Sequence, residues 1–116
     1  MTAPPRKATL LRVYCTETDC QGSQPLYERI VEQARQLHLA GATVLRGVMG
    51  FGRHSRMHTA KILRLSEDLP VVVEIVDSRQ KLQPLLEYLR QHLPEGLVTL
   101  TDVEVLGGEA AESGAD

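Results

Sequence analysis

Residues 71–93, VVVEIVDSRQKLQPLLEYLRQHL, contain the pattern that decides the fold. The apolar run at 71–76 is typical of a strand buried at the centre of a sheet. Leucines then recur along one face of a helix over 79–93. Pro84 conflicts with one straight helix. Either that helix is kinked, or a short turn precedes a helix that starts near Pro84.

The same strand-then-helix order occurs upstream. Residues 9–15 (TLLRVYC) are β-prone, and residues 25–39 carry apolar side chains at helical spacing. We expect Ser23 or Gln24 to cap this helix at its start. Gly41 suits the left-handed position that ends a helix. Residues 42–50 are then expected to form a second strand.

Two further strands complete the series. Residues 57–65 can form one, and residues 97–106 form the last. In the last strand the apolar alternation slips at Thr101–Asp102, which predicts a bulge or a change of pairing there. The order predicts an α+β protein, a ferredoxin-like split βαβ sandwich. Its antiparallel sheet has two helices on one face. The strands carry apolar residues on both sides, so we expect a homo-oligomer to cover the other face.

The 116 residues fit one domain. We expect a flexible arm at 1–7, the domain at 8–106 and a disordered tail at 107–116. Aromatic residues make up 3% and the net charge is −2, which argues against nucleic-acid binding. No apolar run is long enough to insert into a membrane, and the N-terminus lacks an apolar signal, so we expect a cytoplasmic protein. No nucleophile motif is recognisable, which favours a protein that is not an enzyme.

Three glycines lie within six residues at the exit of the second strand, at Gly47, Gly50 and Gly52. Free backbone N–H groups there could bind a phosphate, with Arg53 and Arg56 pairing to its oxygens. The Lys-Ser/Thr of a P-loop is absent. The alternative is that the glycines form a bulge and a tight turn and bind nothing.

Two other sets of residues could carry chemistry. His54 and His58 have the spacing of metal ligands on a helix, but they fall in a loop and a strand, where solvated or hydrogen-bonded histidines are the favoured interpretation. Cys15 and Cys20 match no zinc or redox motif. They are interpreted as a buried thiol and a loop thiol.

Several segments together resemble the DUF190 family: residues 25–28 (PLYE), 39–52 (LAGATVLRGVMGFG), 55–59 (SRMHT), 63–70 (LRLSEDLP) and 96–100 (GLVTL). The family is grouped with the PII-like signalling proteins. This resemblance implies a ferredoxin-like fold, a homotrimer and ligand clefts between subunits. It also implies a regulated protein target, with a membrane transporter as the candidate class.

The resemblance further implies an adenine nucleotide as the leading ligand. The implied ligand-binding residues are Thr43, Gly50, Phe51, Gly52, Arg53 and Arg56. Compared with true PII proteins, the phosphate loop is reduced to residues 94–96, and the last strand carries an acidic pattern at 103–105. Sensing of ATP in the PII manner is therefore not expected. The alternatives are a CutA-like metal-responsive trimer that uses His54 and His58, or a purely structural interaction module.

Overall fold

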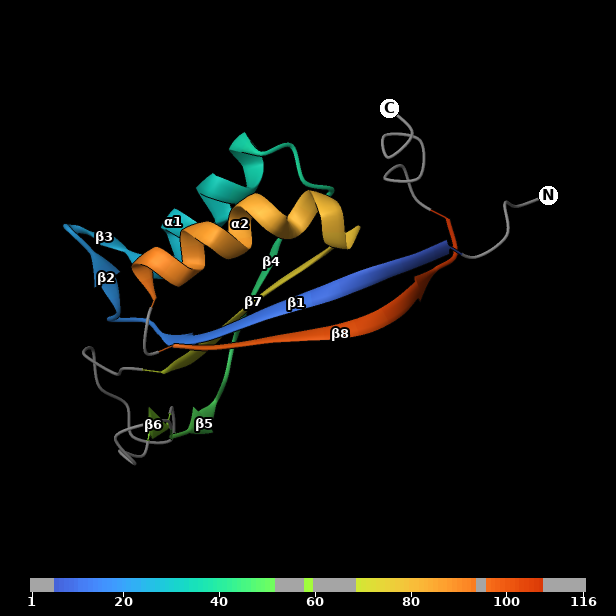
Figure 1. The fold of residues 1–116 in the computed structure, drawn as a ribbon. Helices are drawn as coiled ribbons and strands as arrows, with labels where there is room; N and C mark the ends of the chain where they lie inside the picture. The colour runs from blue at the N-terminus through green and yellow to red at the C-terminus, as the bar shows by residue number, and fades with distance from the viewer. Residues whose placement is uncertain (1–5, 52–57, 60–68, 94–95, 108–116) are drawn as a thin grey trace.

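The computed structural model describes residues 6–51, 58–59, 69–93 and 96–107. Figure 1 shows two layers, a sheet and a pair of helices that cover one of its faces. The sheet contains β1 (Arg6–Thr16), β4 (Thr43–Arg46), β7 (Pro70–Asp77) and β8 (Leu97–Val105), and the helices are α1 (Leu26–Gln36) and α2 (Arg79–His92). Two short hairpins pair β2 (Cys20–Gln21) with β3 (Gln24–Pro25), and β5 (Met49–Gly50) with β6 (His58–Thr59).

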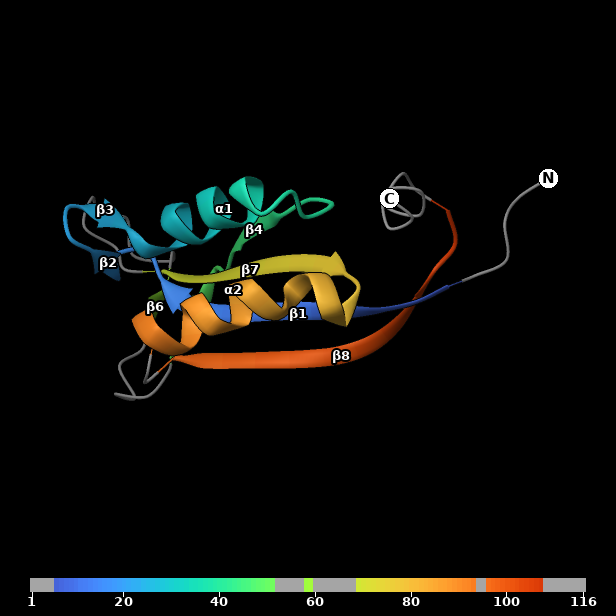
Figure 2. The same cartoon turned by 45° about the horizontal axis from the view of Figure 1, so that its top comes forward.

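The strand order in the sheet is β4-β7-β1-β8, and every neighbouring pair is antiparallel. Strand β7 therefore lies between the two strands that α1 connects, and β1 lies between the two that α2 connects. This interlocking of two βαβ units is the ferredoxin-like split βαβ arrangement. Both helices lie on the same face in the second view as well (Figure 2). The predicted α+β class and architecture are confirmed.

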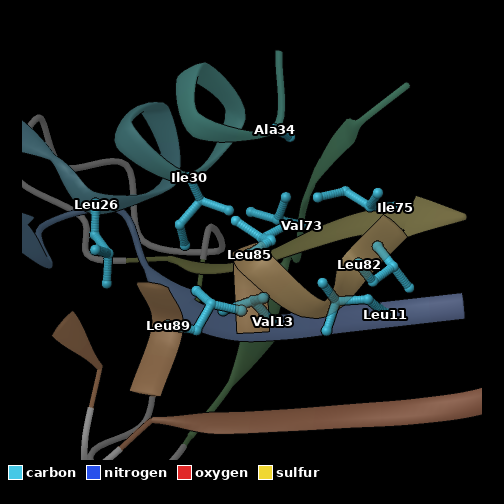
Figure 3. Close-up of a cluster of buried hydrophobic side chains, with 10 residues drawn as sticks. All are labelled: Leu11, Val13, Leu26, Ile30, Ala34, Val73, Ile75, Leu82, Leu85 and Leu89. Atoms are coloured by element: carbon cyan, nitrogen blue, oxygen red, sulfur yellow. The ribbon is translucent and has the colours of Figure 1, made fainter. Parts of the chain in front are cut away.

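The core lies between the helices and the sheet. Leu11 of β1 is paired with Ile75 of β7, and Val13 with Val73, so all four side chains point to the helix side. Figure 3 shows leucines of α2 and apolar residues of α1 packed against them. The buried cluster consists of Leu11, Val13, Leu26, Ile30, Ala34, Val73, Ile75, Leu82, Leu85 and Leu89.

Strand β1 extends past the end of β7. The pairing of β1 with β7 ends where Thr9 lies opposite Asp77. The pairing of β1 with β8 continues to Arg6, which lies opposite Val105. Residues 6–8 and 103–105 thus form a two-stranded ribbon that projects from the four-stranded sheet (Figure 1). Arg6 and Lys7, expected in the arm, belong to this ribbon.

The bulge predicted in the last strand is absent. Thr101 pairs with Leu10 and Asp102 with Thr9, in one unbroken register from Leu97 to Val105. Because Thr101 and Asp102 are both exposed on an edge strand, the two polar side chains can reach solvent on opposite faces without a bulge. The prediction at Thr101–Asp102 is therefore wrong.

Helix α1 ends earlier than expected. His38 has a left-handed backbone (φ 59°), its N–H donates to the Arg35 carbonyl at 3.0 Å, and the Leu39 N–H donates to the Ala34 carbonyl at 3.1 Å. These two bonds form a Schellman motif, in which His38 takes the position that glycine usually occupies. The expected role of Gly41 as helix terminator is wrong.

The start of α1 also differs from the prediction. Its N-cap is Pro25, and no side chain among the described residues caps the helix. The predicted cap at Ser23 or Gln24 is wrong because Ser23 lies in the turn of the β2–β3 hairpin and Gln24 lies in β3. The sequence interpretation, which placed Cys20 in a loop, missed this hairpin. The Tyr88 hydroxyl of α2 secures it by donating to Gln21 Oε1 at 2.8 Å.

Helix α2 is continuous through Pro84. Ser78 caps its start, where Oγ accepts a hydrogen bond from the Lys81 N–H at 3.1 Å. The alternative of a helix starting near Pro84 is therefore wrong. Pro84 is exposed, and it has no N–H to donate to the carbonyl of Gln80 one turn earlier.

The buried carboxylate of Asp77 joins the two βαβ units. Its Oδ2 accepts from the Ala40 N–H at 2.9 Å, and its Oδ1 accepts from the Ser78 N–H at 2.7 Å. Lys81 Nζ lies 3.8 Å from Oδ2. One side chain therefore connects the segment after α1 to the start of α2.

In the part of the chain that the structure describes, neither helix is long and apolar enough to cross a membrane. The strand predicted at 57–65 is described only at residues 58–59, which form β6. The rest of that prediction lies outside the described residues.

Candidate functional site

The predicted second strand is divided at Gly47. Strand β4 ends at Arg46, and β5 begins at Met49. The Gly47 N–H still donates to the Pro70 carbonyl at 2.8 Å, so pairing with β7 continues one residue beyond β4. That N–H is thus occupied within the fold, which contradicts its predicted role in binding a phosphate.

The ring of Pro70 leaves little room for a side chain at two of the three glycines. A Cβ atom on Gly47 would lie 2.9 Å from Pro70 Cγ, and one on Gly50 would lie 3.3 Å from the same atom. Both glycines therefore let the chain pass close to the proline ring. For Gly47, whose N–H is also bonded to Pro70, this supports the alternative in which the glycine serves the backbone, whereas the ligand role of Gly50 stays a prediction.

An ion pair joins this strand exit to the end of β1. Arg46 Nε pairs with Glu17 Oε2, and the Glu17 N–H donates to the Leu69 carbonyl at 3.0 Å. These contacts connect three segments: the residue after β1, the last residue of β4 and the residue before β7. They form a fixed base for the chain that continues into β5.

Only part of the predicted ligand set lies in the described residues. Gly50 is in β5 and pairs with His58, and Phe51 follows it with 65% of its surface exposed. Thr43 begins β4, opposite Glu74 of β7, whereas the far end of β4 at Arg46 is opposite Val71, the residue after Pro70. The structure therefore places Gly50 and Phe51 together, and Thr43 at the other end of β4.

Four candidate residues lie outside the described residues: Gly52, Arg53, His54 and Arg56. The side chain of His58 is not described either. Within the described ranges, no group of three or more His, Cys, Asp or Glu side chains could hold a metal ion. The metal alternative based on His54 and His58 therefore stays a prediction.

The sheet face opposite the helices is called the open face below. Register assigns to it residues of all four strands, namely Leu10, Arg12, Tyr14, Thr43, Leu45, Val72, Glu74, Val76, Leu97, Thr99 and Thr101. Leu97 is 60% exposed and Leu45 is 48% exposed. Neither helix covers this face (Figure 2). The prediction that the strands carry apolar residues on both sides is confirmed.

An ion pair lies in the middle of the open face. Arg12 Nε donates to Glu74 Oε2 at 2.9 Å across β1 and β7. The hydrogen bond that Arg12 donates to Glu74, together with the negative charge of Glu74, raises the pKa of Arg12 above its ordinary value. This pair was missed from the sequence. A signal existed, because Arg12 and Glu74 are the lone charged residues within two apolar strand segments.

The two thiols differ in environment. Cys15 is partly buried on the helix side of β1, and burial, with a smaller contribution from Asp19, raises the pKa of its thiol to about 12. Cys20 is exposed in β2. The pKa of Cys15 leaves it protonated at neutral pH, so it is a poor nucleophile.

Comparison with known proteins identifies relatives across nearly the whole chain. The model of the DUF190 family, described as "Uncharacterized ACR", matches residues 8–105. A UPF0166 protein of Aquifex aeolicus (strain VF5) is 39% identical over 101 residues, which cover 86% of this chain and 94% of that protein.

Solved structures show the same fold at low sequence identity. CPII, a nitrogen regulatory PII-like protein from Thiomonas intermedia K12 bound to ADP, AMP and bicarbonate, is 18% identical. It superposes with a TM-score of 0.70, covering 90% of this chain and 92% of its own. A putative PII-like signaling protein from Thermus thermophilus is 17% identical, with a TM-score of 0.61 over 95% of this chain and 98% of its own. The chain belongs to the DUF190 family and has the fold of PII-like proteins.

Proposed function

We propose that the chain is a PII-like regulatory protein without catalytic activity. It forms a homotrimer through its open face and binds a small ligand, an adenine nucleotide, between subunits. Ligand binding alters the segment that follows β5, and this segment acts on a protein target. A membrane transporter is the class of target to test first.

The observation that carries the proposal is the position of Gly50 and Phe51. Both follow the exit of β4 at Pro70, next to the end of an apolar sheet face that the helices leave bare. A ligand held there would contact the segment after β5 and, in a trimer, a neighbouring subunit. The nucleotides in the CPII structure, which has the same fold, support the choice of ligand.

The described geometry narrows how a phosphate would be held. The Gly47 N–H is already bonded to Pro70, so it is unavailable. We propose that the guanidinium groups of Arg53 and Arg56 bind the phosphates, because arginine pairs with phosphate through two parallel hydrogen bonds. Gly50 and Gly52 would let the backbone approach the ligand closely.

Calorimetry tests the ligand. Titration with ATP, ADP, AMP and cyclic AMP is expected to give saturable heat with at least one nucleotide. Arg53→Ala and Arg56→Ala are expected to weaken binding by about tenfold or more, as the loss of a charge-assisted contact implies. Arg90→Ala is the matched control, because Arg90 lies on α2 and pairs with Glu87. Absence of heat with all four nucleotides would reject the nucleotide.

Light scattering tests the assembly. The wild-type protein is expected to have three times the 12.8 kDa mass of one chain. For the target, a photo-crosslinking residue in place of the exposed Val48, introduced in the host cell, is expected to capture one protein in a nucleotide-dependent manner. A monomer would contradict the trimer, and capture that ignores nucleotide would contradict regulation by the ligand.

A further inference from the structure

The open face consists of rows of side chains that run across the strands. One row is apolar, with Leu45, Val72, Tyr14 and Leu97 lying side by side. The adjacent row is polar, with Thr43, Glu74, Arg12 and Thr99 in the same strand order. In the third row Val76 and Leu10 are again apolar, and Thr101 lies beside Leu10 at the edge of the sheet. A single charged pair is thus set between an apolar row and a row whose two central residues are apolar.

We propose that the Arg12–Glu74 ion pair fixes the register in which copies of this chain pack their open faces together. This inference rests on the homotrimer of the proposed function, and it names the residues that select one register of packing between the subunits. The occupant of the open face is a second copy of the same chain.

Charge supports a second copy as the occupant. Arg12 and Glu74 neutralise each other within one chain at 2.9 Å, and they are the charged residues of the open face where all four strands pair. Arg6 is on the same side of β1 by alternation, but it lies in the projecting ribbon, opposite Val105 and beyond the end of β7. A face without net charge does not repel its own copy, and it offers no excess charge to select an acidic or basic partner. The exposed side of an antiparallel sheet is ordinarily polar, whereas here Val72 and Val76 occupy it. The pattern is that of a covered face.

The ion pair can discriminate between registers because its burial is costly. A covered ion pair needs further hydrogen-bond partners for its remaining N–H groups and lone pairs. The hydroxyls of Thr43 and Thr99 lie in the same row, and a facing copy in the correct register would present the same polar row. In a shifted register, an apolar row would lie against Arg12 and Glu74 and leave them without partners. Wrong registers are thereby disfavoured.

Four variants separate charge from register. Arg12→Met leaves Glu74 alone on the face, and Arg12→Met/Glu74→Leu replaces the pair by apolar side chains. Arg12→Glu/Glu74→Arg exchanges the two charges. The control is Glu87→Leu/Arg90→Met, which removes an exposed pair of 3.2 Å from the outside of α2. Native mass spectrometry and sedimentation over a concentration series report the assembly, and circular dichroism checks that each chain is folded.

Arg12→Met is expected to raise the dissociation constant of the assembly by about tenfold or more, because one charge is left buried without a partner. The apolar double variant is expected to associate as tightly as the wild type but as a mixture of stoichiometries. The charge exchange and the α2 control are expected to keep the wild-type assembly.

The outcomes distinguish the two proposals. A monomeric wild type would reject the homotrimer and, with it, this inference. A trimeric wild type whose assembly Arg12→Met leaves unchanged would reject the inference alone. One wild-type stoichiometry in the apolar double variant would also reject a role in register. Dissociation by Arg12→Met together with mixed species in the double variant supports the inference.

Discussion

The ring of Pro70 occupies the space beside Gly47, where a Cβ atom would lie 2.9 Å from Pro70 Cγ. Since a proline ring cannot move aside as a flexible side chain does, Gly47→Ala is expected to lower the free energy of unfolding by about 1–3 kcal/mol. Urea denaturation measures the change. Gly41→Ala is the control, because nothing lies within 4 Å of its added Cβ. An equal loss in both variants would show that the Pro70 contact is not the cause.

Replacement of Asp77 removes the acceptor that joins the two βαβ units. Asp77→Ala leaves the Ala40 and Ser78 N–H groups without their carboxylate, and we expect a loss of about 1–3 kcal/mol in the free energy of unfolding. Asp102→Ala, at an exposed position of β8, should change it by less than about 0.5 kcal/mol. Thermal or urea unfolding of both variants checks this. Equal stability of the two would contradict the role of Asp77.

The helix end at His38 offers a stabilising substitution. His38 holds a left-handed backbone (φ 59°), which glycine adopts without steric cost. His38→Gly is expected to raise the free energy of unfolding by about 0.5–1 kcal/mol. Gln36→Gly, at the last residue of α1, where the backbone is helical, should not raise it. A loss of stability in His38→Gly would show that side-chain contacts of His38 outweigh the backbone strain.

Pro84 carries a backbone cost within α2. Pro84→Ala supplies an N–H that can donate to the Gln80 carbonyl and removes a clash of the ring with the preceding turn. The gain is reduced by the greater freedom of the unfolded chain, so the expected increase is about 1–2 kcal/mol. Urea unfolding measures it, and Gln83→Ala, also exposed on α2, is the comparison. No gain at Pro84 would mean that the helix has already adapted to the ring.

The stability of the fold should depend on pH through Cys15. Its pKa is raised from 9.0 to about 12 in the folded chain, so the folded state retains a proton that the unfolded state releases. The contribution to stability is present below pH 9 and is lost as the pH rises toward 12. Cys15→Ala is therefore expected to lose less stability than the wild type between pH 9 and pH 12. The wild-type and variant curves remaining parallel would contradict the raised pKa.

Alkylation gives a second readout of the same property. At about pH 8, Cys20 is expected to react with iodoacetamide and Cys15 to remain unmodified, because the thiolate is the reactive form. Mass spectrometry of Cys20→Ser, in which Cys15 is the remaining cysteine, measures this directly. Rapid labelling of that variant in its folded state would show that Cys15 is accessible as thiolate.

Much of the fold was predictable because long elements repeat a pattern. The apolar run of β7 is long enough to indicate a buried strand. The leucines of α2 recur over several helical turns, so their helical period is recognisable. The β2–β3 hairpin has two residues in each strand, too few for any period, and its turn depends on Gly22 (φ 66°). The helix end at His38 was missed because it uses a residue that is rarely left-handed.

The site was less predictable because its relationships are tertiary. The glycine at position 47 suggests both a ligand and a tight turn, and only the position of Pro70, more than twenty residues later, distinguishes these two interpretations for Gly47. The pairing of Arg12 with Glu74 spans 62 residues and depends on the register of β1 and β7. Lone charges in two apolar strands were a usable signal, but they do not reveal which strands are neighbours.

The ribbon formed by residues 6–8 and 103–105 lies at the end of the sheet that is farther from the candidate site, so a label or linker attached to the ribbon would be far from that site. Arg6 lies opposite Val105 at one end of β1, while the exit of β4 adjoins Thr16 and Pro70 at the other, about 33 Å away at about 3.3 Å per residue. A short linker across the ribbon would therefore close the chain into a ring, and a circular permutant could open in the Gly22–Ser23 turn. A fluorophore or surface tether placed on the ribbon would leave Phe51 free.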